Sequence, residues 1–185
     1  MSLENGSKHT IMQIIQKQIQ GQLAWYVART RNGQEISVRN RLASLGIDYF
    51  IPTEQVTNYR GREKEHPIIN CLVFIRSTKA SACELKTNHG LPIKYVTDSA
   101  RHTMLTIPEK QMDDFIRVLT EELYHVDYYD DTITYGERVK ISKGPLKGVE
   151  GNVIEQNGNT YVVVSLNGMA YTKAKVPNSW IKKIH

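Results

Sequence analysis

The residue types that most often carry chemistry are few in this chain, and they lie apart from one another. Cys71 and Cys83 stand twelve positions apart and form no C-x-x-C pair. Neither a disulfide framework nor a zinc site is therefore indicated. Both cysteines fall within runs that predict a strand and a helix, a placement typical of buried structural thiols.

The histidines and the paired carboxylates give no better candidate for catalysis. No two histidines stand at i, i+4, and H-E-x-x-H, P-loop and G-x-G-x-x-G motifs are all absent. Asp113-Asp114 and Asp130-Asp131 lie on the flank of a predicted helix and in a predicted linker, where solvated carboxylates are ordinary. We therefore expect a protein that is not an enzyme and that uses no metal and no cofactor.

Charge is the first sign of a binding function. The 185 residues include 24 Lys and Arg against 19 Asp and Glu, a net charge of +5 at pH 7. From Ile133 onward there are eight basic and three acidic residues, so this segment alone carries +5. Such an excess favours encounters with phosphate or other anionic surfaces, although it does not by itself identify nucleic acid.

The hydropathy pattern argues against a membrane protein. No stretch approaches the roughly 18 continuous apolar residues of a membrane helix. The N-terminus also lacks the basic and then apolar layout of a signal peptide. We therefore expect a cytoplasmic protein without a membrane partner.

The strongest local pattern is a basic, glycine-rich segment from Gly136 to Val153. Gly144-Pro145 predicts a turn, while Gly148 and Gly151 allow a positive φ or a close backbone approach. Asn-Gly pairs farther along are type I′ hairpin signals between β-branched runs. Five short strands over residues 133–185 imply a small closed β-barrel, and any SH3-like barrel would fit this spacing.

The chain before the barrel predicts a ferredoxin-like α/β sandwich, because strands and helices alternate β-α-β-β-α-β-α. Ile68 to Ile75 is apolar on both faces apart from Asn70, which predicts a central strand covered on both sides. Thr106-x-x-Glu109 predicts a capping box before a helix with an apolar stripe from Met112 to Leu123. The expected domains are an N-terminal extension, either a short helix or disordered, then a sandwich, a linker and a barrel, over 1–21, 22–124, 125–132 and 133–185.

The segment around Gly144-Pro145 resembles the KOW motif of ribosomal proteins and of the NusG family of transcription factors. The resemblance extends upstream, because several motifs are similar to the N-terminal (NGN) domain of that family: Trp25-Tyr26-Val27, Asn32-Gly33-Gln34-Glu35, Pro52-Thr53 and Arg60-Gly61. It covers about residues 23–185 in the right order. It implies an elongation or antitermination factor in which an NGN domain precedes a KOW barrel.

Within that family, the chain is more similar to specialised paralogues such as RfaH and the UpxY-type regulators of capsular polysaccharide operons. Ile69-Asn70-Cys71-Leu72-Val73 stands in the place of an aromatic-Pro-Gly/Asn-Tyr-hydrophobic motif, and Asn70 matches the paralogues' asparagine. Asparagine also tolerates a left-handed backbone. The departures, Ile68 for an aromatic, Ile69 for the proline and Cys71 for the tyrosine, keep the surface apolar but remove its large rings.

The resemblance implies three binding surfaces. An apolar surface would bind the clamp helices of RNA polymerase, with candidates Tyr26, Ile68, Ile69, Cys71 and Val73. A basic surface would contact non-template DNA, upstream duplex or nascent RNA, with candidates Arg31, Arg39, Arg41, Arg60 and Arg62. An apolar edge of the barrel would dock a ribosomal small-subunit protein or Rho, with candidates Leu146, Leu166 and Met169.

Other interpretations remain open at this point. The apolar candidates fit the core of a central strand or of the barrel equally well, and single arginines fit a solvated surface. The main alternative function is a ribosome-associated protein that binds RNA through the KOW barrel alone. A third is an enzyme with an unrecognised site at Cys71 or Cys83. RfaH-like proteins can refold their C-terminal domain into helices, but the Asn-Gly hairpins here favour the β form.

Overall fold

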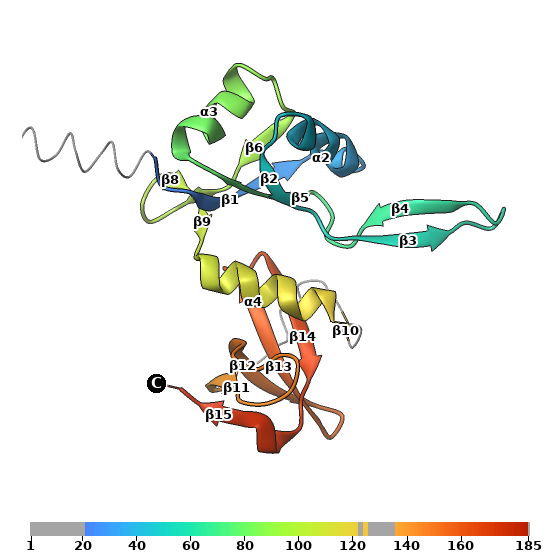
Figure 1. The fold of residues 1–185 in the computed structure, drawn as a ribbon, viewed down its shortest axis with the longest axis vertical. Coiled ribbons are helices and arrows are strands. Elements are labelled where there is room, and N and C mark those ends of the chain that lie inside the picture. Colours follow the sequence, from blue (N-terminus) through green and yellow to red (C-terminus); the bar gives the residue numbers. More distant parts are fainter. Residues whose placement is uncertain (1–20, 122–123, 126–135, 185) are drawn as a thin grey trace, which may run out of the picture. The chain divides into compact units, whose positions relative to one another are not determined.

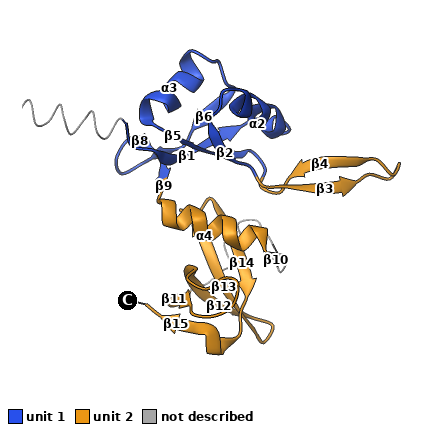
Figure 2. Cartoon of the chain, viewed as in Figure 1, with its two compact units in different colours: residues 1–51, 70–106 blue, residues 52–69, 107–185 orange. Residues whose placement is uncertain are grey.

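The computed structural model describes residues 21–121, 124–125 and 136–184, and it divides into two compact units (Figures 1 and 2). Unit 1 holds the chain up to residue 51 and residues 70–106, and unit 2 holds residues 52–69 and 107–185. The expected N-terminal extension and linker fall almost wholly outside the described residues. The domain boundaries expected from the sequence therefore stay a prediction.

Unit 1 contains an antiparallel sheet in the order β2-β5-β1-β6, with β9 also paired to β1. The strands are β1 Ala24–Thr30, β2 Asp48–Phe50, β5 Leu72–Ser77, β6 Ile93–Tyr95 and β9 Thr106–Ile107. A separate short ladder joins β7 Thr97–Asp98 to β8 Thr103–Met104. The aromatic and β-branched residues of β1 and β5 explain why these strands form the centre of the sheet.

Two helices, α2 Glu35–Ser44 and α3 Lys79–Thr87, lie on one side of this sheet (Figure 1). Val38 and Leu42 of α2 and Leu85 of α3 are buried in one core with residues of β5 and β1. Gly46 ends α2 with a φ of 65°, a left-handed stop that glycine adopts readily. Thr78 is the N-cap of α3, and its side-chain oxygen accepts from the backbone N–H of Ser81.

Unit 2 contains a six-stranded sheet in the order β10-β14-β13-β12-β11-β15, which forms the SH3-like barrel. Its strands are β10 Tyr124–His125, β11 Arg138–Ile141, β12 Glu150–Gln156, β13 Asn159–Leu166, β14 Ala170–Lys175 and β15 Ile181–Lys183, with a 3-10 turn at Asn178–Trp180. Asn157-Gly158 and Asn167-Gly168 have positive φ at both positions, which confirms the predicted hairpin turns. The mixed α/β fold class and the β form of the barrel are thus as expected.

Two glycines allow the barrel to be this tight. A Cβ added to Gly151 would lie 2.3 Å from the carbonyl oxygen of Val163, so β12 and β13 pass too closely there for any side chain. A Cβ on Gly144, whose φ is 75°, would lie 2.1 Å from the ring of Trp180. The glycine-rich pattern therefore reflects close packing as well as turn geometry.

The same unit holds a two-stranded hairpin, β3 Thr53–Thr57 with β4 Glu63–Pro67, and the helix α4 Glu109–Thr120. The predicted capping box of α4 is wrong, since Pro108 occupies the N-cap and no side chain caps the helix. Thr106 belongs to strand β9, and the helix begins at Glu109. The apolar stripe is confirmed at Met112 and Phe115, both fully buried, and α4 packs on β13 and β14.

Candidate functional site

The apolar run predicted as one strand from Ile68 to Ile75 is interrupted, because residues 68–71 form a turn between β4 and β5. Pro67 has no N–H and ends the hairpin ladder. The N–H of Ile68 then donates to the carbonyl of Pro52, 2.8 Å away, and closes the base of the hairpin. The left-handed residue of the turn is Cys71, with a φ of 60°, and not the predicted Asn70.

A buried carboxylate holds this turn in unit 1. The backbone N–H of Cys71 donates to Oε1 of Glu35 at 2.8 Å, and the carbonyl of Cys71 accepts from the N–H of Thr30 at 3.1 Å. Glu35 is fully buried at the start of α2, and its Oε2 has no hydrogen-bond partner among the described residues. Asn70, beside this anchor, is exposed. The anchor therefore fixes the backbone while leaving Asn70 at the surface.

The five candidates for polymerase contact separate by burial. Ile68 and Cys71 are half-buried, whereas Ile69, Val73 and Tyr26 are buried, with Val73 in the core of unit 1. The ring of Tyr26 meets Tyr95 edge-on at 6.2 Å between centroids. Burial, and to a smaller extent the nearby Cys83, raises the pKa of the Tyr26 hydroxyl. The structure thus brings Ile68 and Cys71 into one turn and places Tyr26 and Val73 in the interior.

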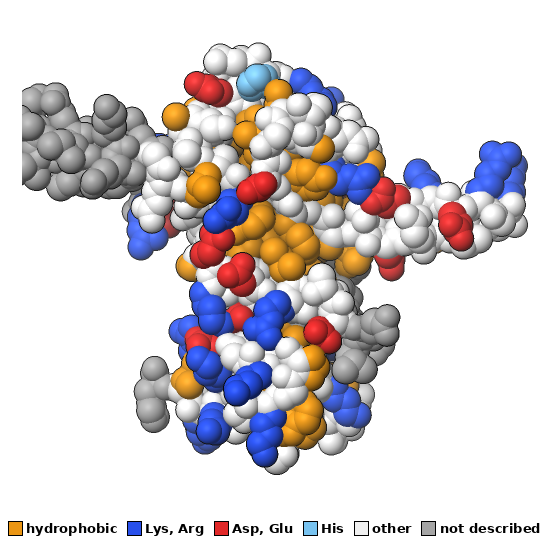
Figure 3. Space-filling view, in the orientation of Figure 1, with side chains coloured by type: hydrophobic (Ala, Val, Ile, Leu, Met, Phe, Trp, Pro, Cys, Tyr) orange, Lys and Arg blue, Asp and Glu red, His pale blue; other side chains and the backbone are white. Residues whose placement is uncertain are grey.

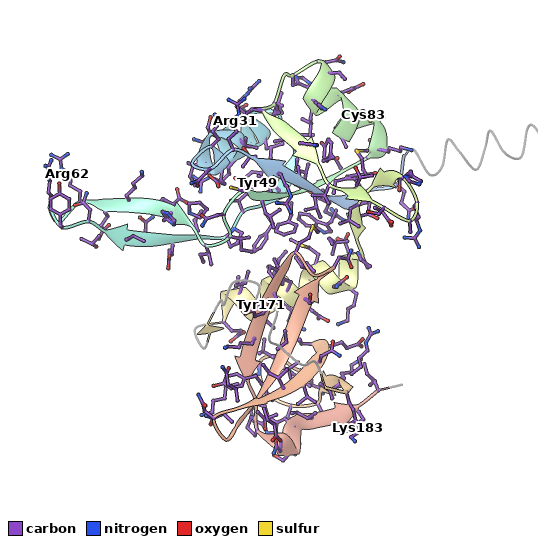
Figure 4. The ribbon with its side chains drawn as sticks, turned by 180° about the vertical axis from the view of Figure 1, so that it is seen from behind. Arg31, Tyr49, Arg62, Cys83, Tyr171 and Lys183 are labelled. Carbon is purple, nitrogen blue, oxygen red and sulfur yellow. The ribbon has the colours of Figure 1, made fainter. Side chains whose placement is uncertain are left out.

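The tip of the hairpin is a basic turn closed by the side chain of Asn58. Oδ1 of Asn58 accepts hydrogen bonds from the backbone N–H groups of Arg60, at 2.9 Å, and Arg62, at 3.0 Å. The guanidinium of Arg60 lies 5.1 Å from the ring centre of Tyr59, whose side chain is 89% exposed. Arg62 points outward at the end of the hairpin (Figure 4). Two arginines and an exposed ring suit contact with nucleic acid.

The three other arginine candidates lie at or near α2 in unit 1. Arg31 is exposed just before the helix (Figure 4), and Arg39 is half-buried. The guanidinium of Arg41 donates to the carbonyl oxygens of His89 and Gly90, so it braces the loop after α3. Arg31, Arg41 and the two hairpin arginines are thus exposed, and Arg41 already donates to these two carbonyl groups.

The predicted docking edge of the barrel is mostly interior. Leu166 is fully buried and Leu146 is 7% exposed, while Met169 is half-buried beside the Asn167-Gly168 turn. Apolar residues of a small barrel are needed for its own core, which explains this placement. Met169 is the one candidate of the three with appreciable exposure.

A network of charged residues joins α4 to the barrel. The carboxylate of Asp114 is buried and accepts from Lys110 and from the backbone N–H of Glu150, the latter at 3.0 Å. Arg117 donates to the carbonyl of Pro145 at 2.9 Å. The hydrogen bond from Lys140, together with the charges of nearby Lys and Arg residues, lowers the pKa of Glu150. The prediction that Asp114 is a solvated carboxylate is therefore wrong, because this side chain is buried and joins α4 to the barrel.

The described residues contain neither a metal-binding cluster nor a membrane-spanning helix. No group of three or more His, Cys, Asp or Glu side chains could hold a metal ion in residues 21–121, 124–125 and 136–184. Within the same ranges no helix is long and apolar enough to span a bilayer.

Comparison with protein families gives the decisive observation. The family model described as "Transcription termination factor nusG" matches residues 23–116, just over half of the 185 residues. This chain belongs to the NusG family. Family membership supports a role in transcription elongation or antitermination, and members of the family are transcription factors.

Other comparisons are more distant. This chain is similar to the solved structure "Domain interaction in Thermotoga maritima NusG". The TM-score is 0.48 and the sequence identity 18%, over 89% of this chain and 98% of that one. The MjSpt4:Spt5 complex in conformation B is similar with a TM-score of 0.27 and 15% identity, over 86% and 96%. No curated protein matches the sequence.

Two features of the candidate site in this NusG-family chain were not predicted. Glu35 entered only through a family motif, and no role was assigned to Asn58 or Tyr59. The run Asn58-Tyr59-Arg60-Gly61 is itself a turn signal, because asparagine side chains bond the backbone two residues on. No local pattern reveals the Glu35 contact, because its partner lies 36 positions away.

Proposed function

We propose that this chain is an elongation or antitermination factor that binds the clamp helices of RNA polymerase through the turn at residues 68–71. Membership of the NusG family is the observation that carries the proposal, and the matched region includes this turn. Ile68 supplies a half-buried apolar side chain and Asn70 an exposed polar one. Burial of an apolar side chain against a helix contributes roughly 25 cal/mol per Å².

The contact surface is narrower than the sequence predicts. Tyr26, Ile69 and Val73 are buried, so we assign the contact to Ile68, Asn70 and the half-buried Cys71. The anchoring of Cys71 by Glu35 supports this assignment, because a preorganised turn loses less conformational entropy on binding.

Nucleic acid is the second partner in this proposal. Arg60 and Arg62 at the hairpin tip, and Arg31 before α2, would contact phosphates of the non-template strand or the upstream duplex. Such contacts give affinity that depends on salt and not on base sequence. The basic side chains at the hairpin tip and over the barrel are visible in Figure 3.

The barrel would recruit a partner protein or contact RNA. Met169 and the turn beside it offer a small partly apolar edge, to which a ribosomal small-subunit protein or Rho would bind. We further propose that the chain is a specialised paralogue of the RfaH or UpxY type, on the basis of Asn70 and the sequence around it. It would then regulate particular operons, such as those for capsular polysaccharide, and would work in the cytoplasm alongside the polymerase.

The test is co-purification of the tagged full-length chain from its host, followed by sequencing of the transcripts bound to the recovered complex. We expect RNA polymerase in the eluate and enrichment of a few operons. Ile68→Asp should lose most of the polymerase, since it places a charge on the apolar contact. Leu23→Asp is the matched control, because Leu23 is 49% exposed and lies away from the turn.

Two results would contradict the proposal. One is the absence of polymerase with the wild-type chain. The other is equal recovery of polymerase with Ile68→Asp and with the wild type, provided that both variants melt at the temperature of the wild-type chain. Uniform recovery of all transcripts would retain the polymerase contact but refute the operon-specific role.

A further inference from the structure

A cleft on the barrel has the composition of a nucleic-acid site. It has a volume of about 680 Å³, within the range typical of sites for small ligands. It is lined by residues 158–161 at the start of β13, by Lys173 and Lys175 of β14, and by residues 176–178. Two lysines and a tyrosine line it, and none of the described residues that line it is an Asp or a Glu. The cleft therefore selects for an anionic ligand.

The register of β13 and β14 places the three key side chains together. Tyr161 lies directly opposite Lys175 in the ladder, so both side chains are on the same face of the sheet. Lys173, two residues before Lys175, shares that face. The three residues form one cluster, which we call the Tyr161 cluster.

The ammonium group of Lys173 is held in position at the ring. Its Nζ lies 5.4 Å from the ring centre of Tyr161 and 3.1 Å from Oε1 of Gln156. The residue as a whole is only 8% exposed. Lys175 is exposed and adds a second charge at the cleft. The Tyr161 ring thus has a fixed cation, Lys173, and an exposed cation, Lys175, beside it in the fold, so these groups are preorganised for a ligand.

We propose that the Tyr161 cluster binds single-stranded nucleic acid, with a base against Tyr161 and phosphate at Lys173 and Lys175. Aromatic stacking together with basic side chains is the common means of binding single strands without sequence preference. The +5 charge of residues 133–185 would increase the rate of encounter. An acidic peptide would satisfy the lysines but would make no use of the tyrosine ring.

This inference rests on the proposed function, because it specifies how the barrel of a transcription factor would contact RNA. It concerns barrel residues that polymerase binding through residues 68–71 does not require. Loss of the cluster should therefore leave co-purification of polymerase unchanged, and the two proposals can fail separately.

The experiment measures fluorescence anisotropy of labelled oligouridylate, oligothymidylate and duplex DNA with the full-length chain, at low and at high salt. We expect the single strands to bind more tightly than the duplex, and affinity to fall with salt. Tyr161→Leu and Lys175→Glu should each weaken binding about five-fold or more, while Tyr161→Phe should retain it. Lys182→Glu is the matched control, because Lys182 is an exposed lysine of the same barrel outside the cleft.

The outcomes divide cleanly. Tighter binding of a single strand than of the duplex supports the proposal. The comparison of oligouridylate with oligothymidylate then shows whether RNA or DNA is preferred. Three results would overturn it. The first is no binding by the wild-type chain, the second is equal weakening by Lys175→Glu and Lys182→Glu, and the third is unchanged binding by Tyr161→Leu. Displacement by an oligoglutamate peptide at the same concentration as the oligonucleotide would also overturn it, in favour of an acidic protein partner.

Discussion

At the scale of single residues, the contact between Glu35 and Cys71 has the clearest consequence. A left-handed backbone is unfavourable for cysteine by about 1–2 kcal/mol, and Cys71 nevertheless adopts a φ of 60°. The hydrogen bond from its N–H to the buried carboxylate of Glu35 offsets that cost. The turn proposed to contact the polymerase thus depends on a side chain on α2.

Glu35→Ala should destabilise the chain by about 1–3 kcal/mol, because it leaves the Cys71 N–H without its acceptor. Urea unfolding followed by circular dichroism measures the change. Glu84→Ala, at an exposed position of α3, is the control and should change stability by less than about 0.5 kcal/mol. Equal stability of the two variants would show that Glu35 does not anchor the turn.

Glu150 provides a pH-dependent prediction. Its pKa in the folded chain is lower than its ordinary value of 4.5, mainly because Lys140 donates a hydrogen bond to it. Its contribution to stability is therefore fully present above about pH 4.5 and is lost as the pH falls through the lower, folded-state value. Glu150→Gln should lower the melting temperature at neutral pH and make little difference in strong acid.

Thermal melts of the wild type and Glu150→Gln across this pH range provide the measurement. Glu155→Gln, at an exposed position of the same strand, should show no such pH-dependent difference. A melting difference for Glu150→Gln that stays constant from neutral to acid pH would refute the role of its ionised form.

At the scale of elements, the β3–β4 hairpin presents its basic tip on a turn that Asn58 holds together. We expect Arg60→Gln combined with Arg62→Gln to reduce the salt dependence of DNA binding. The slope of log affinity against log salt should become shallower by about 1 to 2, since each neutralised phosphate contributes about 0.7 to 0.9. Binding titrations at several salt concentrations provide the measurement.

The control for this prediction removes two positive charges from a different element, α3 of unit 1. Lys79→Gln combined with Lys86→Gln changes two exposed residues of α3 and leaves the hairpin intact. An equal change of slope in both double variants would show that net charge, and not the hairpin tip, determines DNA binding.

The barrel gives a stability prediction at the same scale. Gly151→Ala places a methyl group 2.3 Å from the carbonyl oxygen of Val163, so β12 and β13 must separate. We expect a loss of about 1–3 kcal/mol or more. Gly158→Ala meets no atom within 4 Å and suffers only from its φ of 71°, at a cost of about 1 kcal/mol. Urea unfolding that ranked the two variants in the opposite order would contradict the close strand packing.

The elements were more predictable than the contacts between them. The glycine pattern and the Asn-Gly pairs predicted the barrel, the alternation of strands and helices predicted the sandwich, and apolar spacing predicted α4. The prediction of a continuous strand from Ile68 was wrong, because hydropathy does not distinguish an apolar turn from an apolar strand. Pro67, just before the run, is a residue that commonly ends a strand. The capping box failed because β9 extends to the residue before Pro108.

The candidate site was predicted less well, for a related reason. Sequence position in a family motif does not tell which face of a strand a residue occupies. Tyr26 and Val73 turned out to be interior, and so did Leu166 of the barrel. The Glu35 anchor joins residues that are distant in sequence, so only the folded structure reveals it.

At the scale of the whole molecule, the chain combines a family-matched region with a basic barrel. The match covers residues 23–116, and the charge of +5 resides in residues 133–185. We propose that these correspond to two tasks, polymerase binding and recruitment of RNA or a partner protein. The central claim is that the turn at residues 68–71 contacts the polymerase.

Site-specific photo-crosslinking tests that claim most directly. A photo-reactive residue replaces the exposed Asn70 in the full-length chain, and a second variant carries it at the exposed Lys86 of α3. After irradiation with purified RNA polymerase, we expect a crosslink from position 70 to the subunit that carries the clamp helices, and none from position 86. The absence of a crosslink from position 70, or crosslinks of equal yield from both positions, would contradict the account.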